Sequence, residues 1–596
     1  MAARPKSHDA DTSRKTGRMT DYQPPVDDII TALCLFGGIN DVAQFPEIAH
    51  ADRDTVTGLL TEYGRLIAKV IAPLNKVGDL NPAQLDHETH SVTTAPGFKE
   101  AYRQYMLGGW PCVPFAPAFG GGGFPWSVAI AMNEMVGAAN LAFSLCPLLG
   151  QGAIDAITHH GSAEQKAMYL EKLVLGTWTG TMNLTEPEAG SDVGALRTRA
   201  VKHADGTWRI FGQKIFITYG DHDFTDNIVH LVLARIDGAG PGTKGISCFL
   251  VPKFLVNADG SLGARNDANV VSLEHKMGIH ASPTCVMAYG DQGEGALGEL
   301  LGEPNDGMRT MFTMMNNARL GVGTQGLALA DRAYQMAATY AAQRTQGRAV
   351  GAPAGTESPI IEHPDVQRML LTMQANVAAM RSLIYTNAGA LDAARHHLDA
   401  DARNDAKARA DLLTPLSKAW STDLGVEMTS VALQVFGGMG FVEETGIAQL
   451  YRDSRVAPIY EGTNAIQAID LVTRKITIGG GALIAELFDD AERAAVLAYA
   501  PHVIAVIALA REATTYMLDK VASAPSDALA GATPYLRLVA TAIAGGLMAT
   551  QASQPATSED EIRRVHEARF FCDQLAPLAL GLLPSITSGA GALARR

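Results

Sequence analysis

Hydrophobic positions in the first third of the chain recur every three to four residues, which is the period of an α-helix. The stretch from residue 55 to residue 70 follows this period with Val56, Leu59, Leu60, Tyr63, Ile67 and Val70. Four glycines at 120–123 interrupt the pattern before another expected helix, at about residues 127–139. We therefore expect a helical domain over residues 29–180.

The pattern changes after residue 180, where apolar residues gather in short β-prone runs. These runs lie at 208–211, 228–236, 245–251 and 269–273. Asp-Gly pairs at 205–206, 237–238 and 259–260 provide tight turns between them. Short strands separated by tight turns predict a small antiparallel barrel or sandwich over residues 181–298.

The helical pattern returns after Pro304, with long stretches expected at 308–340, 364–397, 404–436 and 464–478. Four helices with short connections predict a four-helix bundle over residues 299–478. Three glycines at 479–481 indicate a hinge, and the alanine-rich segments beyond it predict an additional helical domain over residues 479–596. The expected fold class is α+β with several domains, preceded by a disordered or extended tail at residues 1–28.

Composition and charge narrow the possible functions. The chain has 596 residues, of which 47% are hydrophobic and 18% charged, as in a soluble enzyme of several domains. A net charge of −14 excludes an overall basic footprint for nucleic acid. The longest apolar run near the C-terminus, 538–550, is too short to span a bilayer, and residues 1–20 lack the apolar core of a secretory signal. We expect a cytoplasmic protein without a membrane contact.

Six cysteines are scattered along the chain, and none lies in a C-x-x-C pair or near a histidine at zinc spacing. We therefore expect reduced thiols and no metal site.

The most informative segment is 458–464 (PIYEGTN), which places a carboxylate, Glu461, just before an apolar helical pattern. Thr463 or Asn464 is suited to cap the first turn of that helix. The helix dipole favours the ionised carboxylate, whereas burial favours the neutral form. A glutamate under such opposed influences is a candidate proton acceptor. The ordinary alternative is a surface residue that only complements the helix dipole.

Several segments, in order, resemble motifs of the acyl-CoA dehydrogenase family. Residues 184–192 (LTEPEAGSD) and 214–218 (KIFIT) resemble its flavin segments, and 434–440 (QVFGGMG) resembles its adenosine-contacting helix end. Residues 451–455 (YRDSR) followed by 459–463 (IYEGT) resemble its C-terminal signature. The resemblance covers roughly residues 60–475. It implies a helical domain, a β domain and a four-helix bundle, with FAD as the cofactor.

The resemblance also implies a chemistry. Glu461 would take the proton α to an acyl-CoA thioester while FAD accepts the β hydride, which gives a trans-2-enoyl-CoA. No amino-acid side chain accepts a hydride, so an organic cofactor is required. The backbone N–H of Glu461 would bind the thioester oxygen. The residues implied in substrate binding are Ser191, Asn316, Arg319 and Gly462; Asn316 stands where relatives often hold an aspartate.

The residues implied in FAD binding are Met182, Leu184, Thr185, Gly190, Ser191, Phe216, Ile217, Thr218, Arg344, Gln434, Gly438 and Thr463. Phe216 replaces the usual tryptophan, and Ala465 stands where many members have glutamine. Arg344 is expected to reach the FAD of a neighbouring subunit, which implies a homodimer. The alternatives are a plain polar turn at 187–192, a solvated arginine at 344 and a glycine helix cap at 438.

The leading hypothesis is an FAD-dependent acyl-CoA dehydrogenase that passes electrons to an electron-transfer flavoprotein. The length of the chain and residues 277–284 (MGIHASPT), with His280 where most members carry arginine, resemble a long bacterial branch of the family. That branch implies 3-methylmercaptopropionyl-CoA as the substrate, or fatty acyl-CoAs of short, medium or broad chain range. The rival hypotheses are an acyl-CoA oxidase and a non-catalytic scaffold.

Overall fold

The structure is a computed structural model that describes residues 21–594, and the expected tail at residues 1–20 lies outside this range. The first helix, α1 (Val26–Leu35), begins inside the segment expected to be a tail. Tyr22 just before it is only 3% exposed, and the guanidinium group of Arg332 lies over its ring at 5.6 Å. Residues 21–28 are therefore attached to the folded protein through Tyr22, and their last three residues belong to α1.

The N-terminal region is helical, and the buried helices α5 (Trp126–Ala139) and α6 (Leu141–His160) form its centre. Around them lie α2 (Arg53–Leu66), α3 (Leu74–Leu80), α4 (Phe98–Leu107), α7 (Ala163–Val174) and a small hairpin of β1 (Gln84–Asp86) and β2 (Ser91–Thr93). Asn140 caps α6 by accepting a hydrogen bond from the backbone of Phe143. Helix α5 begins one residue before its expected start.

The middle region contains β3 (Trp178–Asn183), β4 (Arg199–Lys202), β5 (Trp208–Thr218), β6 (Asn227–Ile236), β7 (Ile246–Pro252), β10 (Ala268–Leu273), β11 (Thr284–Tyr289) and β12 (Ala296–Leu301), with a separate hairpin of β8 (Phe254–Val256) and β9 (Leu262–Arg265). The main sheet has the order β10-β11-β5-β12-β7-β6-β3. Strand β4 pairs with both β5 and β6 and so closes a barrel-like ring. Of the barrel or sandwich that we expected, the structure shows the barrel, but it is not purely antiparallel, because β6 runs parallel to β3 and β4.

The C-terminal bundle is built from three long helices, α8 (Gly307–Gln343), α9 (Pro364–His396) and α10 (Ala400–Phe436). Shorter helices α11 (Ile447–Ser454) and α12 (Asn464–Asp470) complete it, and a π-helical turn (Leu471–Lys475) continues α12. Two glycines of α8 allow close packing on α10. A Cβ on Gly323 would lie 2.6 Å from the carbonyl oxygen of Ser417 in α10, and a Cβ on Gly326 would lie 2.3 Å from that of Ser421.

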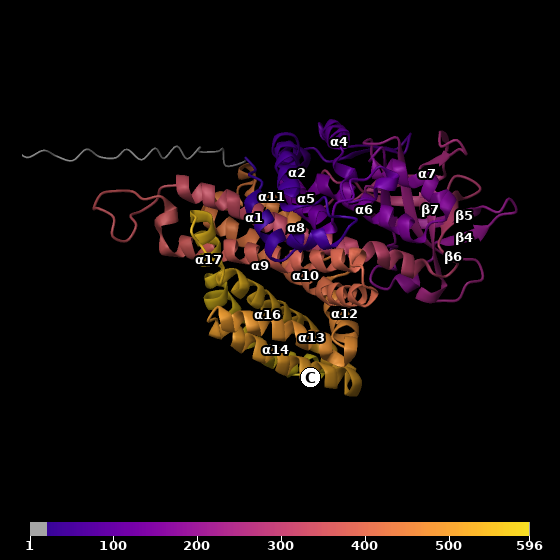
Figure 1. Ribbon diagram of the computed structural model, residues 1–596. Helices are drawn as coiled ribbons and strands as arrows, with labels where there is room; N and C mark the ends of the chain where they lie inside the picture. The colour runs from indigo at the N-terminus through magenta and orange to yellow at the C-terminus, as the bar shows by residue number, and fades with distance from the viewer. Residues whose placement is uncertain (1–20, 595–596) are drawn as a thin grey trace, which may run out of the picture.

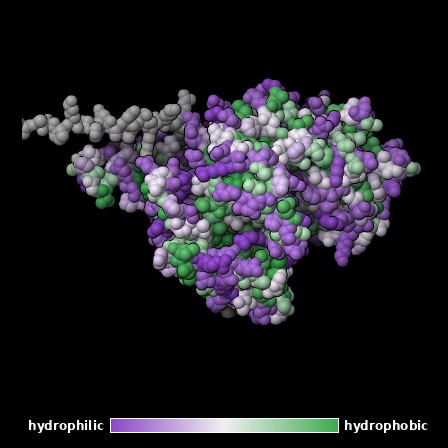
Figure 2. Space-filling model, in the orientation of Figure 1, coloured by the Kyte–Doolittle hydropathy of each residue, from purple (hydrophilic) through white to green (hydrophobic). Residues whose placement is uncertain are grey.

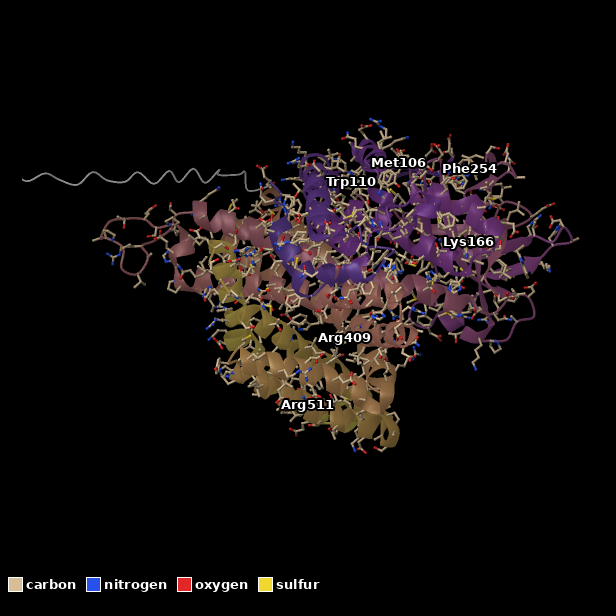
Figure 3. All side chains as sticks on the ribbon, viewed as in Figure 1. Met106, Trp110, Lys166, Phe254, Arg409 and Arg511 are labelled. Carbon is tan, nitrogen blue, oxygen red and sulfur yellow. The ribbon has the colours of Figure 1, made fainter. Side chains whose placement is uncertain are left out.

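An additional helical region follows the three glycines at 479–481, all of which have positive φ. It comprises α13 (Ala482–Leu497), α14 (Pro501–Ser523), α15 (Pro525–Ala530), α16 (Ala532–Ala552), α17 (Glu559–Phe570) and α18 (Leu583–Thr587). Figure 1 shows these helices along the side of the bundle opposite the N-terminal helices. Figure 3 places Arg409 at the boundary, where it pairs with Asp490 of α13 at 3.3 Å.

Two helical segments are long and apolar enough to cross a membrane, judged by length and composition alone: Leu141–His160 and Glu559–Thr587. The first is 83% buried inside the protein and the second 28%. Core helices of soluble proteins pass the same test, so this is weak evidence of a span. Figure 2 shows hydrophilic residues over much of the visible face, with hydrophobic residues interspersed.

Buried charges join the N-terminal region to the bundle. Arg381 of α9 donates to Glu134 of α5 at 2.7 and 3.0 Å and lies 3.7 Å from Asp331 of α8. The hydroxyl group of Tyr385 donates to the second oxygen of Glu134 at 2.8 Å. Burial raises the pKa of Asp331 to about 6, although the charge of Arg381 opposes this rise. The guanidinium group is thus shared by two buried carboxylates.

We expect Arg381→Met to destabilise the protein strongly, because it leaves Glu134 buried without its cation. Loss of one partner of a buried pair costs about 3–5 kcal/mol, whereas an exposed helix pair contributes at most about 1 kcal/mol. The matched control is Arg103→Met, which removes a pair with Glu100 between side chains that are 57% and 53% exposed. Thermal unfolding followed by circular dichroism should show a large fall in Tm only for Arg381→Met; equal shifts would contradict the assignment.

Candidate active site

Glu461 lies in a tight turn between α11 and α12, and its backbone is left-handed, with φ of +55°. Gly462 follows with φ of +80°, which glycine adopts without strain. Thr463 then caps α12 by accepting a hydrogen bond from the backbone of Ile466 at 3.3 Å. Within residues 21–594, no backbone or side-chain group accepts a hydrogen bond from the amide N–H of Glu461. A free donor therefore lies beside the carboxylate.

Two buried cations flank Glu461, Arg319 from α8 and Lys418 from α10. Arg319 is 7% exposed and Lys418 is fully buried. Nη2 of Arg319 lies 3.7 Å from the point where a Cβ on Gly462 would stand. Burial raises the pKa of the Glu461 carboxyl group, and the charges of Arg319 and Lys418 oppose this rise. The pKa of this carboxyl group is therefore set by two opposed influences, desolvation and the two nearby cations, and a carboxylate with a raised pKa is suited to accept a proton.

Tyr460, which precedes Glu461, connects the turn to α8. Its hydroxyl group donates a short hydrogen bond to Oε1 of Gln325. Gln325 is 4% exposed, and its Nε2 has no hydrogen-bond acceptor among the described residues. A buried amide donor thus remains available next to the turn.

The two segments that resemble flavin loops lie side by side in the β domain. The carbonyl group of Thr185, just after β3, accepts a hydrogen bond from the backbone of Ile215 in β5 at 2.9 Å. At the end of β5, the carbonyl group of Thr218 accepts from the Thr181 hydroxyl group at 2.7 Å. Met182 is buried within β3. These contacts fix Leu184 and Thr185 beside residues 216–218.

Phe216 is the outward-facing residue at this place. Its φ is +60°, a left-handed value that is rare for an aromatic residue, and its side chain is 59% exposed. Its neighbour Ile217 is buried, with 2% exposure. Gly190 and Ser191 are exposed, and a Cβ on Gly190 would meet no atom within 4 Å. An exposed aromatic ring beside an open loop suits a flat ring system such as isoalloxazine.

A buried lysine holds these two segments together. Nζ of Lys214 donates to the carbonyl oxygen of Leu184 at 2.9 Å and to Oε1 of Glu186 at 2.7 Å. Glu186 also accepts hydrogen bonds from the backbone N–H groups of Arg197 and Thr198. Burial lowers the pKa of Lys214 to about 8, although Glu186 opposes this change. The loop after β3 therefore depends on one desolvated ion pair.

Three expected FAD ligands form a separate group at the far end of the bundle. Arg344 ends α8, and Gln434 and Gly438 lie at the end of α10; all three are exposed. The stacked rings of Tyr340 and Phe436, with centroids 4.2 Å apart, show that these helix ends adjoin. Arg344 follows Arg319 by 25 residues on one helix, which corresponds to about 37 Å.

The structure thus brings Glu461, Gly462, Thr463 and Arg319 together, and it brings Met182, Leu184 and Thr185 next to Phe216, Ile217 and Thr218. It does not join Arg344, Gln434 and Gly438 to the Glu461 turn of the same chain. Asn316 lies on α8, and its side chain is outside what the structure describes.

Three further residues that support the site were not singled out from the sequence: Lys214, Gln325 and Lys418. Asn464 was expected only as a possible helix cap, but its side chain binds α10 and accepts from Lys418. Lys418 lies in an apolar stretch, 415–420 (PLSKAW), and Lys214 lies among apolar residues of a strand. A lone lysine in an apolar run is a signal for a buried cation, but its partner is set by tertiary packing. Within the described residues, no group of His, Cys, Asp and Glu is arranged to hold a metal ion.

This combination of a helical region, a β barrel and a helix bundle with a poised carboxylate is that of a flavin-dependent oxidoreductase. Family models for the acyl-CoA dehydrogenase N-terminal, middle and C-terminal domains match residues 76–177, 181–291 and 305–476. A model described as "Acetyl-CoA dehydrogenase C-terminal like" matches residues 483–595. The chain belongs to the acyl-CoA dehydrogenase family, and it is an oxidoreductase that acts on acyl-CoA.

Two relatives of known activity also belong to this family. The chain is 43% identical to 3-methylmercaptopropionyl-CoA dehydrogenase of Ruegeria pomeroyi over 93% of its own length and 94% of that protein. It is 39% identical to the broad-specificity linear acyl-CoA dehydrogenase FadE5 of Mycobacterium tuberculosis, over 79% of this chain and 77% of the relative.

Two solved structures share the fold. The Caenorhabditis elegans protein ACDH-11 in complex with C11-CoA matches with a TM-score of 0.78 and 20% identity over 99% of this chain and 96% of that one. An acyl-CoA dehydrogenase of Bacillus anthracis complexed with FAD matches with a TM-score of 0.70 and 22% identity over 94% and 93%.

FAD is the cofactor of this family, and the residues present fit it. The ring of Phe216 is 59% exposed, and a Cβ on Gly190 would meet no atom within 4 Å, so both positions are accessible to a flat ring system. The turn at Glu461 supplies an unpaired backbone donor.

We expect Lys214→Met to reduce FAD binding, because it frees the loop at Leu184 and leaves Glu186 without its cation. The FAD dissociation constant, measured by fluorescence titration of the apoprotein, should rise about tenfold or more, as expected for loss of roughly 1.4 kcal/mol or more. Lys244→Met, at an exposed position of the same domain, is the control. Unchanged FAD affinity in the Lys214 variant would contradict this role.

Proposed function

We propose that Glu461 is the base that removes the α proton during dehydrogenation of an acyl-CoA to a trans-2-enoyl-CoA. The observation that carries this proposal is the left-handed turn that holds Glu461 between Arg319 and Lys418, where burial raises the pKa of its carboxyl group. FAD, when bound, supplies the acceptor for the β hydride. Glu461 holds the abstracted proton.

The backbone N–H of Glu461 is suited to bind the thioester oxygen as negative charge develops there. A donor in this position contributes about 3 kcal/mol to the transition state. Gly462 lets the thioester approach the main chain without a Cβ, and Arg319 and Ser191 are the proposed substrate contacts on either side. Asn316 is proposed only from its place in the sequence.

The proposed FAD contacts fall into two sets. Met182, Leu184, Thr185, Gly190, Ser191, Phe216, Ile217, Thr218 and Thr463 would hold the flavin half within one chain. Arg344, Gln434 and Gly438 lie at the far end of the bundle and would contact FAD of a second copy, since about 37 Å of helix separates Arg344 from Arg319. We therefore propose a homodimer that works in the cytoplasm and passes electrons to an electron-transfer flavoprotein. An electron-transferring flavoprotein structure from Acidaminococcus fermentans is among the solved structures that share this fold, but at 24% identity this likeness concerns the fold alone.

We expect Glu461→Gln to bind FAD normally but to lose substrate-dependent bleaching of the flavin absorption band. The amide is nearly isosteric with the carboxylate but does not accept the α proton. The rate of flavin reduction should therefore fall by about a thousandfold or more, a loss of the size that general base catalysis contributes. Stopped-flow spectroscopy with excess acyl-CoA measures this rate. Turnover at the normal rate would refute Glu461 as the base, and peroxide formed under air by the unmodified enzyme would instead indicate an oxidase.

For the substrate, we infer a short acyl chain whose γ position is a sulfur atom, as in 3-methylmercaptopropionyl-CoA; a fatty acyl-CoA of short, medium or broad chain range is the alternative. Gln325 supports this inference. Gly321, four residues earlier on α8, faces Leu148 of α6, so Gln325 lies on the α6 side of α8 next to Tyr460. A chain that passes Tyr460 meets the unpaired Nε2–H groups of Gln325, for which a thioether sulfur is a weak acceptor and a methylene group is none.

This inference predicts a difference between two nearly isosteric substrates. The unmodified enzyme should show a kcat/KM about two- to tenfold higher for 3-methylmercaptopropionyl-CoA than for pentanoyl-CoA, as expected from one modest hydrogen bond. Gln325→Leu should abolish this preference. It also removes the acceptor of the Tyr460 hydroxyl group, so kcat/KM should fall for both substrates, and the ratio of the two values is the test. The same ratio in both proteins would show that Gln325 does not select the sulfur.

A further inference from the structure

Lys418 is a fully buried lysine on α10, directly behind the Glu461 turn. Its Nζ donates to the carbonyl oxygen of Gly462 at 2.9 Å and to Oδ1 of Asn464 at 2.8 Å. Both acceptors lie within three residues of Glu461. The lysine therefore binds the backbone of the turn itself and not only a neighbouring helix.

Asn464 extends this attachment. Its Nδ2 donates to the carbonyl oxygen of Ala419 at 3.1 Å, to the hydroxyl group of Thr422 at 3.0 Å and to Asp423 at 2.7 Å. Each of these partners is on α10. The first residue of α12 is thus fixed to α10 by the same side chain that accepts from Lys418.

The turn needs such support because of its backbone. A non-glycine residue with positive φ is held at a cost of about 1–3 kcal/mol and persists only when its surroundings impose it. Nε2 of Gln467 is the other donor to the turn, at 3.4 Å from the carbonyl oxygens of both Glu461 and Gly462. These are longer hydrogen bonds than the one from Lys418, so Lys418 is the main restraint on the Gly462 carbonyl group.

The charge of Lys418 acts on Glu461 as well. The charged groups that act on Lys418 are Glu461 and Asp423, which favour its charge, and Arg319, which opposes it. Burial lowers the pKa of Lys418 to about 7. At pH values below the pKa of Lys418, its side chain is a charged ammonium group. This charge favours the ionised form of Glu461, which is the form that accepts a proton.

We propose that Lys418 is a positioning residue, which holds the carboxylate of Glu461 toward the substrate through Gly462 and Asn464 and stabilises its ionised form. This inference rests on the proposed role of Glu461 as the base. It concerns a fully buried residue whose hydrogen-bond acceptors, Gly462 and Asn464, belong to the turn and the start of α12.

Proton abstraction can be observed apart from hydride transfer with 3-thiaoctanoyl-CoA, in which sulfur replaces the β carbon. This compound can lose an α proton to Glu461 but has no β C–H bond from which a hydride could leave. An enolate stacked on oxidised flavin gives a long-wavelength absorption band. Its amplitude against pH reports the apparent pKa of the base, and its rate of formation reports the placement of the base.

In the FAD-loaded protein we expect Lys418→Met to move the pH midpoint of this band upward by about one unit, because loss of a nearby cation raises the pKa of Glu461. Band formation should be about ten- to a hundredfold slower at saturating ligand, as for a misplaced reacting group. Lys407→Met is the matched control, since Lys407 is on the same helix with a 66% exposed side chain. It should behave as the unmodified protein.

The proposal would be overturned if Lys418→Met left both the pH midpoint of the band and its rate of formation unchanged. It would also be overturned if the variant lost FAD or had a lower Tm while the fraction that retained FAD showed a normal pH midpoint. If this variant does not fold, Lys418→Arg decides. Lys418→Arg keeps the positive charge but not the hydrogen-bond geometry, so it should show a normal pH midpoint and slower formation of the band. A normal rate of formation with a raised pH midpoint would contradict the proposal. Absence of the band in the unmodified protein would instead contradict Glu461 as the base.

Discussion

The left-handed turn at Glu461 and Gly462 is the constraint on which the rest of the site depends. Such a backbone is strained at a non-glycine residue, and it persists here because three helices restrain it. Gln325 of α8 binds Tyr460, Lys418 of α10 binds the Gly462 carbonyl group, and Thr463 caps α12. Close packing of α8 on α10 through glycines brings these restraints to one place.

Buried ion pairs recur wherever two regions of this protein must keep a fixed relation. Arg381 and Glu134 join the bundle to the N-terminal helices, and Lys214 and Glu186 join two segments of the β domain. Desolvation offsets much of the attraction in such pairs, so they contribute little net stability. Their effect is geometric, because each charged group has only one arrangement in which its buried partner is satisfied.

Much of this architecture could be predicted from the sequence. The local sequence predicted α5 and the three long bundle helices nearly to their ends, because a helical stretch and the residues that interrupt it can be recognised from neighbouring positions. The mixed character of the sheet could not be predicted, since the parallel pairing of β3 with β6 joins strands that are distant in the chain. The Glu461 turn was found from its local motif. Lys418 was missed because its relation to the turn spans 43 residues and exists only in the packed bundle.

The same geometry is the basis for our proposal that a second copy completes the FAD site. The bundle helices are so long that residues at their two ends cannot meet one small molecule within a single chain. The additional C-terminal helices contact α9 and α10 along their sides. In the turn that follows α10 and contains Gly438, Met439 is 47% exposed and Phe441 96%. A second copy that covers them would bury apolar surface and at the same time bring Arg344 to the FAD of its partner.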